Sequence, residues 1–397
     1  MVDYAVQIIF LHVTWLFKRF SKEDAQDATK VDLLCTRRDT ALQTFSPLFL
    51  GETTNTANAV RRQAFISFIN THVLFAKRAE GRGGAPASDV CSVAVPDEIQ
   101  HRLGGAFQAA IERYASVMET RSAGQEESQQ RESYYSSKHM TIILIQSAAR
   151  ELTPDEIQED LHFFQLVSVF VGAIRCGVLE VEHAKEPLAH YSRFGPTYDS
   201  IVKKLVDVLR DEGIYNREAD AVQHVAGSAL QQSFNIFLDS EEDEPTAPLA
   251  LARVIATAFV IHGSQFAILR QLHPSDVCDF HLEALDFVSR KFSTTVKQEG
   301  NARNKEQKSR LTRKKWAVLT FFKVLVPLLG PVTGKDALKI KAHLEDVIDS
   351  SGVQLTTNKG WDGYRAYEKR LIGIASKDPN VKMMASKKVI EREDTEG

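Results

Sequence analysis

Apolar residues recur at three- and four-residue steps along almost the whole chain, and this spacing limits the fold more than any other feature. In the segment NAVRRQAFISFINTHVLFAKR, one helical stripe contains Phe65, Phe68, Ile69, His72 and Phe75. No segment shows sustained alternation of apolar and polar residues bounded by hairpin turns, so we expect no sheet. The pattern predicts an all-α protein.

The helix starts are also well marked. Thr153 stands before Pro154 and three residues before Glu156, which is the arrangement of a capping box with proline at the first helical position. The rhythm predicts roughly a dozen helices in antiparallel pairs, each pair taking about 40 residues, the period of HEAT-like repeats. We therefore predict an α-α solenoid, a HEAT-like superhelix, over residues 1–375, followed by a disordered charged tail at 376–397.

Several segments depart from this rhythm. The apolar N-terminal segment, residues 2–20, lacks the basic region and cleavage site of a signal peptide, and we expect a helix buried by neighbours on two sides. Residues 80–89 and 121–133 are polar and predict flexible loops. Two further polar interruptions are charged: an acidic run at 239–245 and a basic run at 297–315.

Composition limits the classes of function. Hydrophobic residues make up 43% and charged residues 25%, so the chain can bury a core. The net charge of -3 gives no general attraction to nucleic acid, which leaves only a local basic patch for that role. The four cysteines are far apart without C-x-x-C spacing, which indicates reduced thiols and neither a disulfide framework nor a zinc site.

The segment GPVTGKD at residues 330–336 resembles a phosphate-binding loop only superficially. Gly330 and Gly334 enclose three residues where a Walker A loop has four, and Asp336 stands where the magnesium-binding hydroxyl belongs. A cap at Thr333 with Asp336 three residues later explains the same letters. We expect a helix start here, and a nucleotide hydrolase is the enzyme alternative that this interpretation disfavours.

Histidines give no clear metal site. His183 and His190 are seven residues apart and could share one helix face, but they lack a nearby carboxylate and cysteine cluster. His72 lies on an apolar stripe, which favours a core histidine over a ligand. No nucleophile motif or paired metal-binding histidine motif is present, so we predict no catalytic residues, no metal and no cofactor.

The basic run is the first candidate for binding. With the helix that follows it, it offers cations that could neutralise DNA phosphates without reading the sequence. A solvated linker and an ordinary polar helix face explain the same residues equally well. The candidate DNA-binding residues are Arg303, Lys305, Lys308, Arg310, Arg313, Lys314, Lys315, Lys335 and Lys339, with His343 on the same face of the following helix.

The order of several segments resembles the C-terminal half of the stromal antigen (STAG) family of cohesin subunits, particularly its fungal nuclear members. The segments that carry the resemblance are VRRQAFISFINTHVLFAKR, ALQQSFNIFLDS, ALARVIATAFVIHG, DFHLEALDFVSRKF, RKKWAVLTFFKVLVPLLGPVTGKDALKIKAHLEDV and WDGYRAYEKRL. Together they span most of residues 30–373. None is a catalytic signature, so the resemblance depends on their order and spacing.

The resemblance implies a curved, non-catalytic HEAT-repeat subunit that binds the kleisin chain of cohesin and contacts DNA in the nucleus. It places candidate kleisin contacts in the segment GPTYDSIVKKL, at Tyr198, Asp199, Lys203 and Lys204. The N-terminal half of the family has no counterpart, so we expect part of a longer subunit. The alternative is a helical-repeat adaptor for transport or trafficking with no role on DNA, in which the amphipathic array binds an extended peptide.

Overall fold

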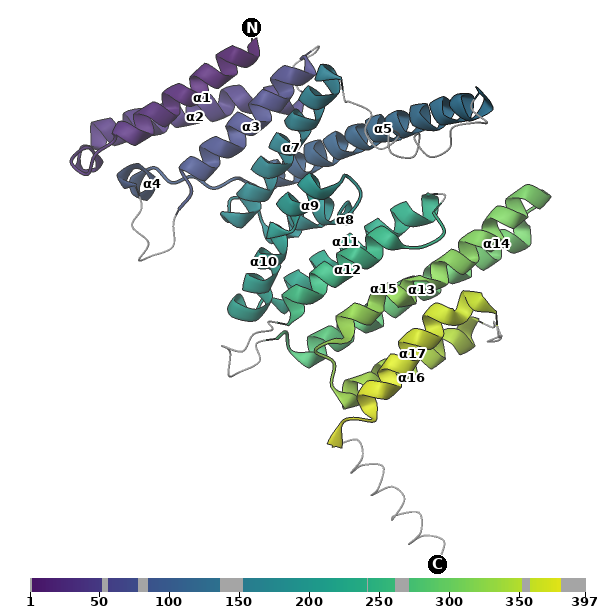
Figure 1. The fold of residues 1–397 in the computed structure, drawn as a ribbon. Coiled ribbons are helices and arrows are strands. Elements are labelled where there is room, and N and C mark those ends of the chain that lie inside the picture. Colours follow the sequence, from purple (N-terminus) through teal and green to yellow (C-terminus); the bar gives the residue numbers. More distant parts are fainter. Residues whose placement is uncertain are drawn as a thin grey trace, which may run out of the picture. The chain divides into compact units, whose positions relative to one another are not determined.

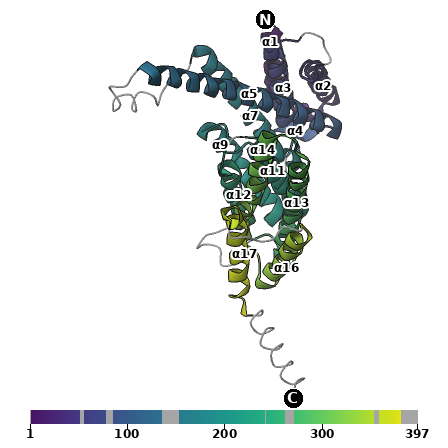
Figure 2. The same cartoon turned by 90° about the vertical axis from the view of Figure 1, so that its right-hand side faces the viewer.

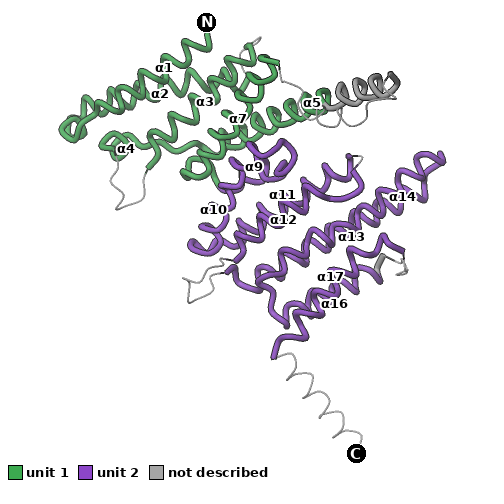
Figure 3. Tube along the Cα trace, in the orientation of Figure 1, with its two compact units in different colours: residues 1–180 green, residues 181–397 purple. Residues whose placement is uncertain are grey.

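The structure is a computed structural model and it is helical throughout the part that it describes (Figure 1). It describes residues 2–51, 56–77, 85–135, 153–240, 242–260, 271–351 and 358–379. Within these ranges the only β pairing is an isolated bridge between Val260 and Gln271, so the predicted all-α class is confirmed for them. The chain divides into two compact units, residues 1–180 and 181–397 (Figure 3).

Unit 1 packs its helices around aromatic rings. Its elements are α1 (Val2–Arg19), η1 (Asp24–Gln26), α2 (Ala28–Leu50), α3 (Asn58–Leu74), α4 (Pro86–Val90), α5 (Asp97–Tyr135) and α7 (Pro154–Arg175). Helix α3 is central because α1, α2 and α7 all pack against it. Its predicted stripe from Phe65 to Phe75 is buried, as the three- and four-residue spacing requires.

Two local predictions for unit 1 are corrected. The N-terminal helix forms, but only one face is buried, through Val6, Val13 and Phe17, while Trp15 is 51% exposed. Residues 121–133 continue α5 where a loop was expected. Their glutamate, glutamine, arginine and alanine residues favour a helix, and the single Gly124 costs only about 1 kcal/mol relative to alanine, which does not end it.

Unit 2 contains most of the helices. Its elements are η2 (Val181–Ala184), α8 (Lys185–Ala189), α9 (Pro196–Val202), α10 (Lys204–Arg210), η3 (Asp211–Asn216), α11 (Ala219–Asp239), α12 (Thr246–Phe259), α13 (Pro274–Asn301), α14 (Lys305–Leu319), α15 (Phe321–Leu325), η4 (Val326–Leu329), α16 (Gly334–Ser351), η5 (Lys359–Trp361) and α17 (Asp362–Ala375). The final helix ends at the predicted boundary of the helical region. Residues 380–397, most of the predicted tail, lie outside the described residues.

Helices of unit 2 alternate between two layers. Helices α11, α13 and α16 pack side by side, and α12, α15 and α17 form the second row. Figure 2 shows α12 and α17 on one side and α13 and α16 on the other. Phe321 of α15 joins the rows because its ring lies 4.7 Å from that of Phe234 on α11 and 5.3 Å from that of Phe287 on α13. From α11 to α17, successive helices therefore stand in opposite layers when α14 and α15, which follow one another directly, are counted as one stretch.

A close approach fixes α17 against α14. A Cβ atom on Gly363 would lie 2.8 Å from the carbonyl oxygen of Leu319, so only glycine lets the two backbones come this near.

The basic run at 297–315 is more ordered than the predicted linker. Residues 297–301 end α13 and residues 305–315 begin α14, where Asn304 caps the new helix by accepting from the backbone N–H of Glu306.

The cysteines and the hydropathy of the helices complete the description of the fold. All four cysteines are free: Cys91 and Cys278 are buried, Cys35 is partly exposed and Cys176 is exposed. Burial raises the pKa of the Cys91 thiol to about 12. None of the described helices combines the length and hydropathy needed to cross a membrane.

Candidate functional site

The predicted kleisin contacts divide into a core residue and surface residues. Tyr198 is 0% exposed, and its hydroxyl donates to the carbonyl oxygen of Pro187 at 2.8 Å. Its ring also meets Phe194 edge to face at 5.1 Å between centroids. The family resemblance implied a contact at this tyrosine, but its side chain anchors α9 in the core, so Tyr198 does not offer a contact surface.

The other three residues lie at the break between α9 and α10. Lys203 and Lys204 are exposed, whereas Asp199 is half-buried. The Asp199 carboxylate accepts from the backbone N–H of Ser192 at 2.7 Å, and Ser192 has a φ of 66°, unusual for a residue other than glycine. Burial raises the pKa of Asp199, and the hydrogen bond from Ser192 opposes that shift. Asp199 therefore has a structural role, and only the two lysines are freely presented.

Part of the predicted DNA-binding set is already paired with carboxylates. Arg313 lies 3.0 Å from Asp243, Lys314 lies 2.8 Å from Asp239, and Lys315 lies 2.6 Å from Glu299. The first two carboxylates belong to the acidic run. The structure thus brings the acidic and basic runs together, which the linear sequence does not indicate.

The remaining cations of the run are more accessible. The N-terminal part of α14 and the turn before it expose four cations that form no ion pair with a described carboxylate, Arg303, Lys305, Lys308 and Arg310. Lys335 at the start of α16 is also exposed. Lys339 and His343, further along α16, face carboxylates of α13, with Asp279 at 3.3 Å and Asp286 at 2.8 Å. The structure therefore leaves a smaller basic patch than the sequence suggests.

The segment GPVTGKD forms the predicted helix cap. The backbone N–H of Asp336 donates to the Thr333 hydroxyl at 3.3 Å, and the same hydroxyl donates to the Asp336 carboxylate at 2.6 Å. The carboxylate of Asp378 also accepts from the backbone N–H of Gly334 at 3.0 Å. The residues before the segment are helical, from α14 through η4, and not the strand that precedes a Walker loop.

The three histidines considered as ligands from the sequence, His72, His183 and His190, occupy interior positions. His183 and His190 are both buried, in η2 and after α8, and no group of three or more possible metal ligands is found among the described residues. Burial lowers the pKa of His190 to about 3 and that of His72 to about 4. His72 packs on Phe68 at 4.7 Å between rings, which agrees with the predicted core position, although its Nδ1 has no hydrogen-bond partner in the described part.

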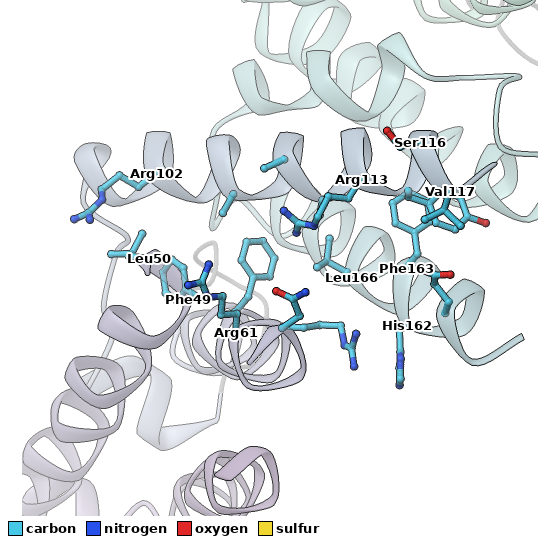
Figure 4. Close-up of a pocket in the computed structure, with 18 residues that line it drawn as sticks. Phe49, Leu50, Arg61, Arg102, Arg113, Ser116, Val117, His162, Phe163 and Leu166 are labelled. Carbon is cyan, nitrogen blue, oxygen red and sulfur yellow. The ribbon is translucent and has the colours of Figure 1, made fainter. Parts of the chain in front are cut away.

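Unit 1 contains a groove that the sequence did not predict. It has a volume of about 760 Å³ and lies between α2, α3, α5 and α7 (Figure 4). Its floor includes Phe65 of α3, Tyr114 of α5 and Phe163 of α7, and the last two rings stack at 3.8 Å. Phe107 and Phe170 also stack, at 3.9 Å, and the ring of Phe170 lies 6.3 Å from that of Phe65, so the lining rings continue into a packed aromatic core.

Arginines from two helices line the groove. Arg61 and Arg62 come from α3, and Arg102 and Arg113 come from α5. Figure 4 shows Arg61 and Arg113 extending toward the space between their helices. Alanines 106, 109 and 110 of α5 leave room between the two α5 arginines. The repeated arginines and the alanine-rich stripe are visible in the sequence, but nothing there shows that they meet.

The groove has an excess of positive charge. Its single lining carboxylate, Glu159, lies 3.1 Å from Arg121, which also binds Asp160 at 2.8 Å. Burial lowers the pKa of Arg62, and the pKa of His162 is lowered first by burial and then by the charge of Arg62. The field in the groove therefore favours an anion.

Comparison with known proteins adds no identification. No protein-family model and no curated protein sequence matches the chain.

Proposed function

We propose that this chain is a non-catalytic helical adaptor of the cohesin type, which binds a kleisin segment and helps the ring associate with chromatin in the nucleus. The observation that carries the proposal is the two-layer alternation of unit 2. Stacking of successive helices in opposite layers is what a HEAT-like solenoid requires, and such arrays serve as surfaces for extended partners.

The segments that resemble the stromal antigen family support the same proposal. They coincide with helices in the resembling order: α3, α11, α12, α13, the α14–η4 stretch, α16 and α17. Each of these helices buries apolar residues within its own unit. The resembling segments therefore fall on packed helices, although they cover only part of α11 and of α13.

A pull-down with a recombinant kleisin fragment tests the partner. Lys203→Glu with Lys204→Glu should weaken binding at least about tenfold, since the two charges are exposed and their reversal costs more than 1.4 kcal/mol at a charged contact. Lys18→Glu with Lys22→Glu is the matched control, as both residues are exposed in unit 1. Binding that is equal in both variants would remove the lysine pair from the interface, and absence of kleisin binding by the unaltered chain would refute the partner.

Contact with DNA is tested separately. Replacing Arg303, Lys305, Lys308 and Arg310 with alanine should reduce the slope of log affinity against log salt by as much as about 3.6, from 0.9 per phosphate contact. Affinity should not depend on DNA sequence, because the patch offers charge without a groove-reading element. An unchanged slope would favour the alternative, an adaptor without a role on DNA.

A further inference from the structure

The arginine-lined groove of unit 1 has the charge and shape of a peptide-binding site. We propose that it docks an acidic peptide segment of a partner protein, with carboxylates on the arginines and one aromatic or large aliphatic side chain in the groove. This inference does not depend on the cohesin proposal, whose tests concern residues of unit 2.

The groove is complementary in charge to an acidic peptide. Arg61 and Arg113 line the groove and form no ion pair with a described carboxylate, and the lining carboxylate Glu159 pairs with Arg121. Arg62 also lines the groove, and the charge of Asp3 opposes the lowering of its pKa by burial. The Nε atom of Arg61 is buried without a hydrogen-bond partner in the described part of the chain. A buried guanidinium donor without an acceptor is costly, and a carboxylate can satisfy two such donors at once.

The groove also has room for a side chain between its arginines. A volume of about 760 Å³ lies within the range of ligand-binding pockets, and Ala106, Ala109 and Ala110 keep the α5 side open. Leu50 of α2 and Val117 of α5, both half-buried, supply apolar surface. One large apolar side chain buried here would act as the anchor around which charged contacts are arranged.

The aromatic floor argues for a peptide over a single-stranded nucleic acid. Phe65, Tyr114 and Phe163 are 3%, 5% and 7% exposed, so their faces are occupied by packing and are not open platforms for stacked bases. The groove therefore suits a short anchored segment.

Fluorescence anisotropy on the full chain tests the proposal. The probe is a labelled peptide with three glutamates on either side of one phenylalanine. Its affinity should fall at least about tenfold in the Arg62→Glu, Arg113→Glu double variant and by less than about twofold in the control Arg37→Glu, Lys77→Glu, whose charges are exposed elsewhere in unit 1. Replacing the peptide phenylalanine with alanine should weaken binding at least about threefold.

A second variant separates loss of the site from loss of the fold. Ala109→Leu fills the groove without changing charge and keeps a good helix former, so it should reduce peptide affinity while unit 1 stays helical. No binding of the acidic peptide by the unaltered chain would overturn the proposal. So would equal affinity in the double variant, or tighter binding of a single-stranded oligonucleotide that the same arginines control.

Discussion

The ammonium of Lys314 lies 2.8 Å from the carboxylate of Asp239, and this contact joins two charged runs that are 75 residues apart. Arg313 and Lys323 make similar pairs with Asp243 and Glu244. Acidic side chains at the end of α11 and in the segment after it thus cover part of the basic helix α14. The two runs therefore form ion pairs with each other within the chain.

Neutralising the acidic run should expose more positive charge. We expect Asp239→Asn and Glu244→Gln together to raise affinity for duplex DNA and to steepen its salt dependence by as much as about 1.8, because the pairs with Lys314 and Lys323 are broken. Each pair is largely exposed, so the free energy of unfolding should change by less than about 1 kcal/mol per pair. Anisotropy titrations at salt concentrations between about 50 and 200 mM measure the change in slope. Identical slopes for both proteins would show that the covered cations do not face DNA.

Replacing each of two glycines of α17 with alanine should change the free energy of unfolding in opposite directions. Gly363→Ala puts a methyl group 2.8 Å from the Leu319 carbonyl oxygen and should lower the free energy of unfolding by about 1–3 kcal/mol. Gly373 has no atom within 4 Å of its Cβ position, and Gly373→Ala should raise that free energy by up to about 1 kcal/mol. Urea unfolding of both variants measures the contrast. Equal effects would mean that the backbone approach at Gly363 relaxes freely.

His281 should make stability depend on pH. The ring is fully buried, with Nδ1 2.9 Å from the Tyr367 hydroxyl, and burial lowers its pKa from 6.5 to about 4. Between these values the unfolded chain binds a proton that the folded chain does not, so the free energy of unfolding falls as pH decreases from about 6.5 to about 4. The full contribution is about 3 kcal/mol.

The variant His281→Gln isolates this contribution. It should be less stable than the unaltered chain at pH 7, because it disturbs the contact with Tyr367, yet lose less stability between pH 7 and pH 4.5. Urea unfolding at the two pH values gives the difference. Since His72 and His190 also have lowered pKa values, a smaller pH dependence should remain in the variant. A pH dependence equal to that of the unaltered chain would mean that His281 is not the group responsible.

Asp199 should behave as a folding residue rather than a contact residue. Asp199→Ala removes the acceptor for the Ser192 N–H in a turn with positive φ and should lower the free energy of unfolding by about 1–2 kcal/mol. Lys203→Glu, four residues later and exposed, should change stability by less than about 0.5 kcal/mol. Thermal unfolding compares the two. If both are neutral, the turn holds without its carboxylate.

Local patterns along the chain predicted much of the helical structure. The Thr153 capping box, the Thr333 cap and the buried stripe of α3 follow from residue types at fixed spacing, which local backbone geometry enforces. The extension of α5 through residues 121–133 was missed because polarity was interpreted as a loop. Polar residues with high helix propensity can continue a helix in solvent.

The binding surfaces depend on contacts between distant segments, which one sequence does not specify. The pairing of Lys314 with Asp239 arises only in the tertiary structure, and so does the common groove lined by arginines of α3 and α5. Tyr198 is a similar case at one residue, since the family resemblance implied a contact there while its ring is buried in the core. Periodicity identifies a buried face but not the partner helix that covers it.

Cys176 is a native labelling site from which occupancy of the groove can be followed. It is the exposed thiol among the four cysteines and directly follows α7, the helix that contributes Phe163 and Leu166 to the groove. Ten residues of helix place Leu166 about 15 Å from it along the axis, at 1.5 Å per residue. A maleimide dye at this position would stand outside the peptide contacts and within range of a quencher on a bound peptide. Occupancy of the groove can then be followed without introducing or removing a single residue.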